Sequence, residues 1–433
     1  MTTSPVAAVP GMTDAALVLC LVLLLVSPLS VAGVALINAG LGRSRSAAQA
    51  LLGNLAIIAV SAIVFAVAGA SLTGFAGGTG LAFHVAGKPW NWVGGSPLLL
   101  GGLAGTPLQS QLGLLFAFVA LSLVTLIPWG SGADRLRLHA GAAIAAVMAL
   151  LVFPLLAHWV WGGGWLGQLG VNFSLGAGFL DPAGAGTIHL MGGLSALTVI
   201  WVAGPRRGKF PKEGFATAMP GHNAAYILFG CMVTLVGWLA FNLAGAMLWV
   251  HASLAALPVT AINTLLLASG SLCATYTVTR IRFGKPDASL CANGWLTGLV
   301  ASSACAAVVT PGVALTVGVI AGICTPLLVE FLELAVTIDD PSGAIAVHAG
   351  GGLLGLLTAG LFAPQPGQLV AQMVGIGAIV GLMLPLLYVL FRALDRFVPF
   401  RVEPDGERIG MDLHELGGGA YPEFVIHRDE SYR

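Results

Sequence analysis

The chain has 433 residues, of which 57% are hydrophobic and only 8% are charged, and its formal net charge at pH 7 is zero. Soluble globular proteins carry about 25% charged residues. This composition excludes a soluble globular protein and a partner bound through a basic surface, so we expect no nucleic-acid partner. It predicts an integral protein of the cell membrane, plasma or inner, that crosses the lipid bilayer many times.

Eleven apolar segments are long enough to cross a membrane as helices, which takes about 20 residues each. Turn signals and charges separate them into 14–38, 49–74, 109–131, 138–161, 181–204, 222–248, 252–276, 288–308, 312–335, 343–363 and 368–392. The 60 glycines favour close packing, because small residues let membrane helices approach one another. The sequence predicts an all-α membrane protein with eleven transmembrane helices, a transmembrane domain over residues 1–396 and a cytoplasmic tail over 397–433.

The basic residues between these segments indicate the orientation. Most of them follow odd-numbered segments, namely Arg43, Arg45, Arg135, Arg137, Arg206, Arg207, Lys209, Lys212, Arg280, Arg282 and Lys285. Lys88 alone lies in a connection on the other side. Cytoplasmic loops are enriched in Lys and Arg, so we expect the N-terminus outside and the C-terminus inside. An odd number of spans agrees with that placement.

Two segments, 181–189 and 340–348, share one pattern. Each begins with Asp-Pro, has Gly two residues after the Pro, and has His eight residues after the Asp. The carboxylates of Asp181 and Asp340 can cap the first amides of a helix, and Pro fits the first helical position. We therefore expect each helix to begin at its proline, with the histidine about 12 Å inside at 1.5 Å per residue.

The two histidines, His189 and His348, fall in the fifth and tenth predicted spans, which cross the membrane in opposite directions. This favours an inverted repeat of spans one to five and six to ten, with the eleventh span as an addition. Transport sites in such proteins lie near the bilayer midplane, at the interface of the repeats. Both imidazoles should therefore approach the midplane from opposite sides.

Ionisable residues inside a membrane usually have a function. Two neutral imidazoles could share one hydrogen bond and offer their outer nitrogens to a small polar solute. A charge at the bilayer centre costs at least ~2.5–3.5 kcal/mol, and no carboxylate is expected at that depth. A neutral solute, or a proton and a neutral molecule moving separately, is therefore favoured.

Three other interpretations of the histidines remain open: two separate structural histidines, a metal site and a bis-histidine haem site. A metal site needs three or four ligands, and haem-binding bundles usually supply more than one His per helix. We expect no metal and no cofactor. No nucleophile–base pair or nucleotide-binding loop is evident, so an enzyme is not predicted.

Over nearly its whole length the chain resembles the ammonium transporter (Amt/Mep/Rh) family, in particular its Amt-like branch. The two Asp-Pro segments resemble the family's twin-histidine motifs. Further matches are Trp161-Gly162-Gly163-Gly164, Gly237-Trp238 with Phe241-Asn242, Ala292-Asn293-Gly294, and the tail from Gly410 to Tyr421. The resemblance implies eleven transmembrane helices and a homotrimer with one pore in each subunit.

The resemblance also implies an outer site that recruits ammonium. The aromatic face of Trp161 would attract the cation, with Asp181 supporting it from below. Gly245 stands where many family members carry a serine, so this site should bind ammonium more weakly. Ser303 is similar to a family threonine near the mouth and would compensate in part.

Below the outer mouth, the resemblance implies a gate of two phenylalanines and a polar pore wall. Phe241 matches the inner ring of the gate, and either Phe116 or Phe118 supplies the outer ring. Trp238 and Asn242 would support the pore wall.

The mechanism that the resemblance implies begins with ammonium losing its proton below the mouth. Ammonia then passes His189 and His348, and the proton moves separately. A neutral-gas channel of the Rh kind for NH3 or CO2, a urea-like channel and an ammonium sensor remain alternatives. The tail is implied to pack beneath the trimer, where a PII-type regulatory protein could dock.

Overall fold

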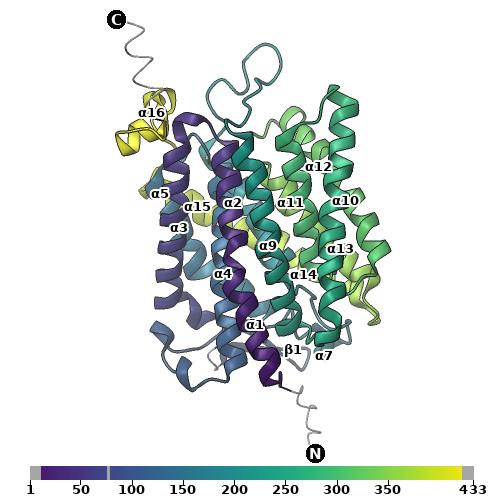
Figure 1. Cartoon of the computed structure of the whole chain (residues 1–433). Coiled ribbons are helices and arrows are strands. Elements are labelled where there is room, and N and C mark those ends of the chain that lie inside the picture. The colour runs from purple at the N-terminus through teal and green to yellow at the C-terminus, as the bar shows by residue number, and fades with distance from the viewer. Residues whose placement is uncertain (1–10, 76–78, 422–433) are drawn as a thin grey trace, which may run out of the picture.

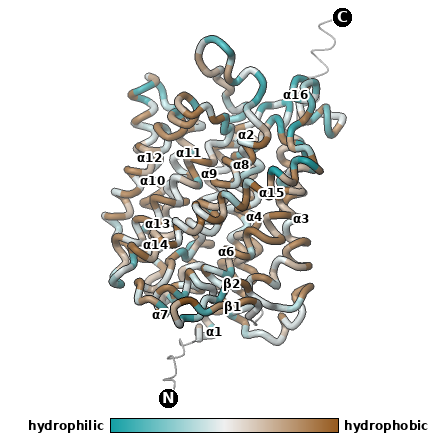
Figure 2. The backbone as a smooth tube through the Cα atoms, turned by 180° about the vertical axis from the view of Figure 1, so that it is seen from behind, coloured by the Kyte–Doolittle hydropathy of each residue, from teal (hydrophilic) through white to brown (hydrophobic). Residues whose placement is uncertain are grey.

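The computed structural model describes residues 11–75 and 79–421. The chain forms an elongated bundle of helices, with α1 starting at one end and α16 lying at the other (Figure 1). The middle of the bundle is mainly hydrophobic, and hydrophilic residues gather at the two ends (Figure 2). This distribution is the one that a bilayer demands of a protein spanning it.

The bundle is built from sixteen α-helices and one pair of strands within the described residues. In chain order they are α1 (Asp14–Val26), α2 (Pro28–Leu41), α3 (Ala47–Val67), β1 (Thr79–Val85), β2 (Lys88–Gly94), α4 (Leu108–Ser131), α5 (Leu138–Val147), α6 (Phe153–Val160), α7 (Leu169–Phe173), α8 (Met191–Ala203), α9 (Ala224–Trp249), α10 (Leu257–Phe283), α11 (Ala288–Cys305), α12 (Pro311–Leu334), α13 (Gly351–Phe362), α14 (Gln368–Ala378), α15 (Leu384–Phe397) and α16 (Pro404–Ile409). Short π-helical turns precede α6, α8, α13 and α15.

Ten helical segments among the described residues are long and apolar enough to cross a membrane. They correspond to ten of the eleven predicted spans, and the protein is a multi-pass membrane protein. The remaining predicted span, 288–308, is the 18-residue helix α11, which carries buried polar residues such as Asn293, Thr297 and Ser302. The count of eleven spans, the orientation and the inverted repeat stay predictions.

Glycines bring the helix backbones close together. A Cβ atom at Gly33 of α2 would lie 2.6 Å from the carbonyl oxygen of Gly230 in α9, and one at Gly322 of α12 would lie 2.0 Å from that of Ser271 in α10. No side chain fits at such distances, so these crossings require glycine. This is the close packing that the abundance of glycine predicts.

One element was not expected in an all-α protein. β1 and β2 form an antiparallel hairpin between α3 and α4. Trp90 and Trp92 of β2 stack on Trp165 at ring-centroid distances of 4.9 and 5.9 Å, and the indole N–H of Trp159 donates to the Trp92 carbonyl. The helical prediction therefore holds for the membrane-spanning body, and the hairpin is an addition held by stacked tryptophans.

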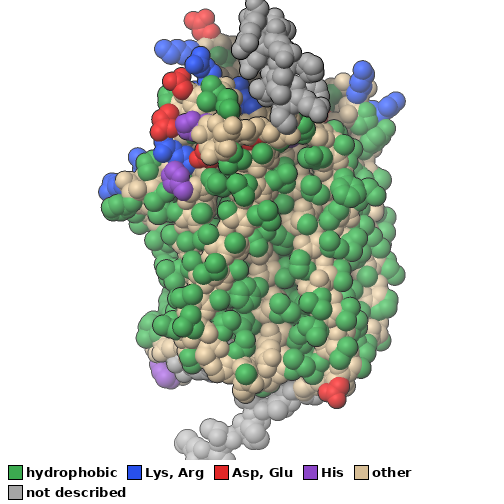
Figure 3. Space-filling view, turned by 60° about the vertical axis from the view of Figure 1, so that its left-hand side comes forward, with side chains coloured by type: hydrophobic (Ala, Val, Ile, Leu, Met, Phe, Trp, Pro, Cys, Tyr) green, Lys and Arg blue, Asp and Glu red, His purple; other side chains and the backbone are tan. Residues whose placement is uncertain are grey.

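The tail beyond Phe397 packs against the end of the bundle. Asp412 accepts hydrogen bonds from the N–H groups of Ala48 and Gln49, at the start of α3. Glu415 accepts one from the N–H of Leu138, at the start of α5. Neither helix has a side-chain cap of its own, so the tail supplies the carboxylates that cap both. Charged side chains cluster at this end, while the flanks are hydrophobic (Figure 3).

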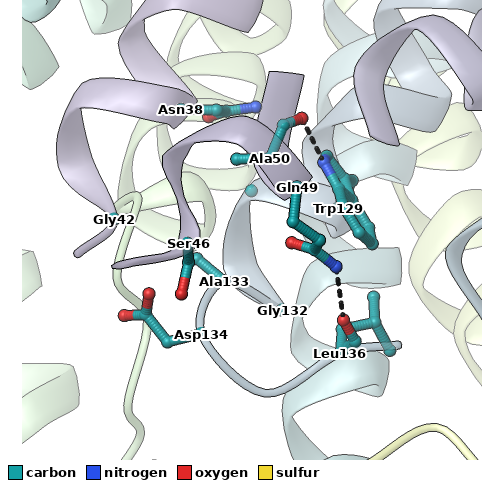
Figure 4. Close-up of a pocket in the computed structure, with 11 residues that line it drawn as sticks. Asn38, Gly42, Ser46, Gln49, Ala50, Trp129, Gly132, Ala133, Asp134 and Leu136 are labelled. Atoms are coloured by element: carbon teal, nitrogen blue, oxygen red, sulfur yellow. Dashed lines mark hydrogen bonds between the residues drawn. The ribbon is translucent and has the colours of Figure 1, made fainter. Parts of the chain in front are cut away.

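A small cavity lies beside this docked tail, between α2, α3 and α4. It is lined by polar groups that include Asn38, Gln49 and Asp134, and the Gln49 amide donates to the Leu136 carbonyl at its edge (Figure 4). Its volume is about 10 Å³, which is close to the room that one water molecule needs. It is too small for a transport site.

Candidate functional site

The two Asp-Pro segments begin their helices later than expected. Gly184 and Gly343 adopt left-handed conformations, with φ of +82° and +67°. The prediction that the helices start at the prolines was wrong, because these turns separate Pro182 and Pro341 from the helical residues. The first helix starts at Ala185, so His189 lies about 6 Å inside it at 1.5 Å per residue.

The two aspartates still act on the helix starts. Asp181 accepts hydrogen bonds from the N–H groups of Gly186 and Thr187 and from the Thr187 hydroxyl. Asp340 accepts one from the Ile345 N–H at 2.8 Å. Each carboxylate reaches across its glycine turn to amides that would otherwise lack partners. The hydrogen bond from the Ile345 N–H is the contact that the expected capping role of Asp340 requires.

His189 and His348 lie side by side, deep in the bundle. Their ring centroids are 5.2 Å apart, their planes are inclined by 15°, and the residues are 1% and 5% exposed. Trp238 of α9 stacks on His189 at 4.9 Å. Among the described residues, neither ring nitrogen of His189 has a hydrogen-bond partner. The rings therefore meet face to face, and the hydrogen bond expected between them is not formed.

The two helices that carry the histidines cross closely, and each contributes a glycine to the contact. Gly193, four residues after His189, would place a Cβ 2.5 Å from the N atom of Ala349, the residue after His348. Gly352, four residues after His348, would place one 2.4 Å from the Ala185 carbonyl oxygen and 3.1 Å from the N atom of Leu190. Two glycines at equivalent positions thus let the two histidine helices touch.

A methyl group at this crossing should force the histidines apart. We expect Gly352→Ala to lower the free energy of unfolding by about 1–3 kcal/mol, the usual cost of overpacking a close-packed interior. Thermal unfolding in detergent measures this. Gly377→Ala is the control, because a Cβ there meets no atom within 4 Å, and equal stability of the two variants would contradict the prediction.

The three candidate gate residues divide into a pair and a single residue. Phe116 of α4 stacks on Phe241 of α9 with 4.2 Å between ring centroids and 12° between planes. Both rings are fully buried. Phe118 instead contacts Phe65, edge to face at 5.0 Å. The structure brings Phe116 to Phe241 and leaves Phe118 away from them.

A cavity of about 660 Å³ is lined by residues that include Trp161, Asp181, Pro182, Trp249 and His251. We call it the outer cavity, because the predicted orientation puts this end of the bundle outside. The indole N–H of Trp161 donates to the Asp181 carbonyl at 2.8 Å. The aromatic side chain and the capping aspartate are therefore linked through the backbone. Sequence reasoning missed Trp249, because an aromatic residue at the end of a span is typical of any membrane interface.

Gly245 and Ser303 lie next to the first Asp-Pro segment. A Cβ at Gly245 would be 2.1 Å from the Pro182 carbonyl oxygen. The Ser303 carbonyl accepts the N–H of Ala183, and its hydroxyl accepts the indole N–H of Trp238. The Pro182 carbonyl oxygen lies so close to residue 245 that only glycine fits there. The Ser303 hydroxyl positions the Trp238 indole, which stacks on His189.

Introducing a serine at position 245 should therefore damage the protein. We expect Gly245→Ser to destabilise the fold by about 1–3 kcal/mol through overpacking. Gly245→Ala should behave alike, since the clash comes from Cβ. Thermal unfolding of both variants in detergent tests this. A serine variant as stable as the parent would refute it.

Asn242 joins three helices beside the Phe pair. Its amide N–H group on α9 donates to the Thr264 hydroxyl of α10 at 3.1 Å and to the Ser302 hydroxyl of α11 at 2.8 Å. Asn242 is 3% exposed. It therefore fixes the α9 face that carries the neighbouring Phe241.

A buried ion network lies at the tail end of the bundle, close to the second Asp-Pro segment. Arg206 pairs with Asp339 at 2.8 Å and with Asp134 at 3.1 Å, and Arg135 lies 3.6 Å from Asp339. All four residues are buried. Sequence reasoning used Arg135 and Arg206 only to predict the orientation in the membrane. The sequence does not indicate which charged residues of the connecting loops are buried together.

Known proteins match the chain almost from end to end. The model of the Ammonium Transporter Family matches residues 16–421. Ammonium transporter Amt2 of Archaeoglobus fulgidus is 31% identical over 421 residues, covering 92% of this chain and 86% of that protein.

Solved structures agree with this match. A structure titled "Sensor Amt Protein" covers 92% of this chain and 98% of its own, with a TM-score of 0.83 and 26% identity. Candida albicans Mep2 shares the fold, with a TM-score of 0.74 at 22% identity over 91% of this chain and 87% of its own. By sequence along nearly its whole length, the chain belongs to the Ammonium Transporter Family.

Proposed function

We propose that this protein conducts ammonium across the cell membrane. It recruits NH4+ in the outer cavity, removes the proton near the Phe pair, and conducts NH3 past the two histidines while the proton moves separately. The supporting observation is one line of contacts: Trp161 lies 5.2 Å from Phe116, which stacks on Phe241, and the next helical turn of α9 carries Trp238 against His189.

The outer cavity has the chemistry to attract a small cation. A tryptophan face attracts ammonium through its quadrupole, and the attraction grows when water is excluded. Trp161 is 7% exposed and is oriented by its bond to the Asp181 carbonyl. The Asp181 carboxylate adds negative charge beneath it, already satisfied by three donors, so it stabilises a nearby cation without binding it directly.

The Phe pair divides the cavity from the histidines. Two phenyl rings stacked at 4.2 Å leave no room between them, so a molecule passes only when a ring swings aside. Such a barrier offers ammonium no hydrogen-bond acceptor in exchange for its hydration shell. Deprotonation before this barrier removes the cost of moving a charge through it.

The histidines provide polar atoms where the rest of the path is apolar. Neutral imidazole carries one donor and one acceptor nitrogen, and both nitrogens of His189 and Nδ1 of His348 are unpartnered among the described residues. Ammonia both donates and accepts hydrogen bonds, so it can replace the missing partners as it moves.

An electrical recording tests this proposal. Purified protein in liposomes should give a transient current when ammonium is added outside, and protein-free liposomes should give none. Acidification or alkalinisation inside the liposomes, followed with a dye, reports ammonia movement separately. Ammonia movement without current would favour a neutral-gas channel and overturn net ammonium transport.

A sensor is the second candidate, because the neighbour with a TM-score of 0.83 is titled "Sensor Amt Protein". A sensor needs binding at the outer cavity and a response at the other end of the bundle, without transport. Ammonium binding measured by calorimetry, combined with absence of both current and ammonia movement, would favour it.

We also propose a homotrimer, with a tail that regulates transport. Exposed apolar side chains on α9, α10 and α12, for example Phe229, Ile262 and Ile320, suit contacts with lipid or a second subunit. Light scattering in detergent measures the number of subunits.

The tail caps two membrane helices, because Asp412 and Glu415 accept hydrogen bonds at the starts of α3 and α5. Truncation before residue 398 should therefore change transport. A pull-down with a PII-type protein tests whether such a partner docks at the same end of the bundle.

A further inference from the structure

One wall of the outer cavity is a stretch of chain without regular secondary structure. Residues 177–183 lie outside every helix and strand. The members of this stretch that line the cavity are Ala177, Phe179, Leu180, Asp181 and Pro182. Because no helix or sheet pairs its buried N–H and C=O groups, these groups need partners from elsewhere. Those partners determine the shape of the wall.

Two glutamines of α14 supply several of the partners. Oε1 of Gln372 accepts the N–H of Leu180 and its Nε2 donates to the Leu180 carbonyl, both at 2.8 Å. Gln368 accepts the N–H of Ala177 and donates to the Gly178 carbonyl, also at 2.8 Å. Both glutamines are buried. Each side-chain amide therefore pairs with the wall as the backbone of a neighbouring strand would.

The glutamines share one face of α14 with a glycine. Residues 368, 372 and 375 follow the spacing i, i+4 and i+7, which places them on one side of a helix. A Cβ atom at Gly375 would come within 2.0 Å of the Phe179 ring, so only glycine leaves room for that ring. This face of α14 therefore fits segment 177–183 both by hydrogen bonds and by shape.

α14 begins the eleventh predicted span, 368–392, which has no counterpart in the predicted inverted repeat. Gln368 and Gln372 are the polar side chains of this otherwise apolar helix, and amides at membrane depth need hydrogen-bond partners. Their partners are mainly the backbone of the cavity wall, with a longer contact of 3.4 Å from Gln372 to the Leu356 carbonyl of α13. The polar groups of the additional span are thus directed at the outer cavity.

The residue that Gln372 holds precedes one that the proposed transport depends on. Leu180 is followed by Asp181, whose carbonyl accepts the indole N–H of Trp161 at 2.8 Å. The Asp181 carboxylate accepts the N–H of Thr187, at the start of the first histidine helix. A displacement of Leu180 would therefore move Asp181 and change both contacts.

We infer that Gln368 and Gln372 are positioning residues of the outer cavity: they fix segment 177–183 and thereby set how tightly the cavity binds ammonium. The inference rests on the proposed recruitment of ammonium there and adds two residues of the eleventh span to it. Within the described part of the chain, neither glutamine is among the residues that line the cavity. They therefore act through the wall and not by contact with the ion.

Gln372→Met tests the inference, because methionine keeps the length of the side chain and loses both hydrogen bonds. In liposomes containing the full chain, this variant should raise the ammonium concentration for half-maximal current about 10-fold, as expected when a buried hydrogen-bond pair is lost. The maximal current should be unchanged, because the steps beyond the cavity are unaltered. Gln368→Met should act in the same direction and replaces Gln372→Met if that variant does not fold.

Asn54→Leu is the matched control for the loss of a buried amide. Asn54 of α3 is 2% exposed and donates to the Ala35 carbonyl of α2, and neither residue lines the outer cavity. This variant should keep the parent's half-maximal ammonium concentration. An equal rise in Asn54→Leu and Gln372→Met would indicate general damage to the bundle and refute the positioning role.

Hydrogen exchange gives a second measurement that does not depend on transport. In detergent, the amides of 177–183 should exchange faster in Gln372→Met than in the parent, and those of α9 should not. Unchanged exchange in 177–183, or faster exchange without weaker ammonium affinity, would overturn the inference and leave transport intact. A parent without ammonium current would refute transport. In that case, equal ammonium affinity of the parent and Gln372→Met by calorimetry would overturn the inference separately, and weaker affinity of the variant would support it.

Discussion

Replacing either His189 or His348 with alanine should reduce the net ammonium current to the background of protein-free liposomes. Each replacement removes polar atoms at the only pair of stacked imidazoles in the described bundle, 5.2 Å apart. The single imidazole that remains has no second ring to which it can pass ammonia or a proton. Current recordings on the two variants, at equal protein density, measure the loss.

The histidine prediction needs a control for the loss of a buried imidazole as such. His158 of α6 is also fully buried, and its Nδ1 lies 3.0 Å from the Thr73 carbonyl oxygen, away from the twin-histidine pair. His158→Ala should still carry current. Parent-level current in His189→Ala and His348→Ala, with both variants eluting as the parent does, would refute the proposed role of the pair.

The meeting of the histidines could be predicted because the repeated Asp-Pro pattern and the distribution of basic residues are both visible in the sequence. The exact distance of each histidine from the start of its helix could not be predicted. One glycine in each segment, Gly184 and Gly343, adopts a left-handed turn, and nothing in the pattern distinguishes such a turn from a helix start at Pro. The face-to-face geometry also depends on Trp238, whose indole stacks on His189 from another helix.

The choice between Phe116 and Phe118 was open for a similar reason. Residues two apart lie about 200° apart around a helix of 3.6 residues per turn, so only one can point at α9. In a helix that is apolar on every side, periodicity does not mark the inward face. The packing of α4 against α9 brings Phe116, and not Phe118, onto Phe241.

The second large effect concerns stability. Asp339→Ala should lower the free energy of unfolding by about 3–5 kcal/mol, because removing one partner leaves buried charges uncompensated. The Asp339 carboxylate is 1% exposed and accepts hydrogen bonds from the backbone and side chain of Arg206. Arg135 also loses its neighbouring charge. Thermal unfolding in detergent at pH 7 measures the difference.

The same network predicts how stability depends on pH. Burial by itself would raise the pKa of Asp339, but the hydrogen bond from Arg206 and the charge of Arg135 outweigh it and hold that pKa below its usual range. Burial lowers the pKa of Arg135 to about 10, so its guanidinium stays protonated at neutral pH. A lowered carboxyl pKa adds stability above the unfolded value of about 3.9, and this is lost as the pH falls through the folded value.

Parent and Asp339→Ala should therefore differ fully at pH 7, and the difference should shrink as the pH falls below about 3.9 and through the lowered pKa of the folded protein. Asp405→Ala is the control, because Asp405 pairs with Arg408 in a fully solvated setting, at 3.4 Å with both side chains more than three-quarters exposed. Exposed pairs contribute about 0–1 kcal/mol. If both variants lose the same stability at pH 7, or if the Asp339 difference persists unchanged into acid, the buried network does not hold this end of the bundle together.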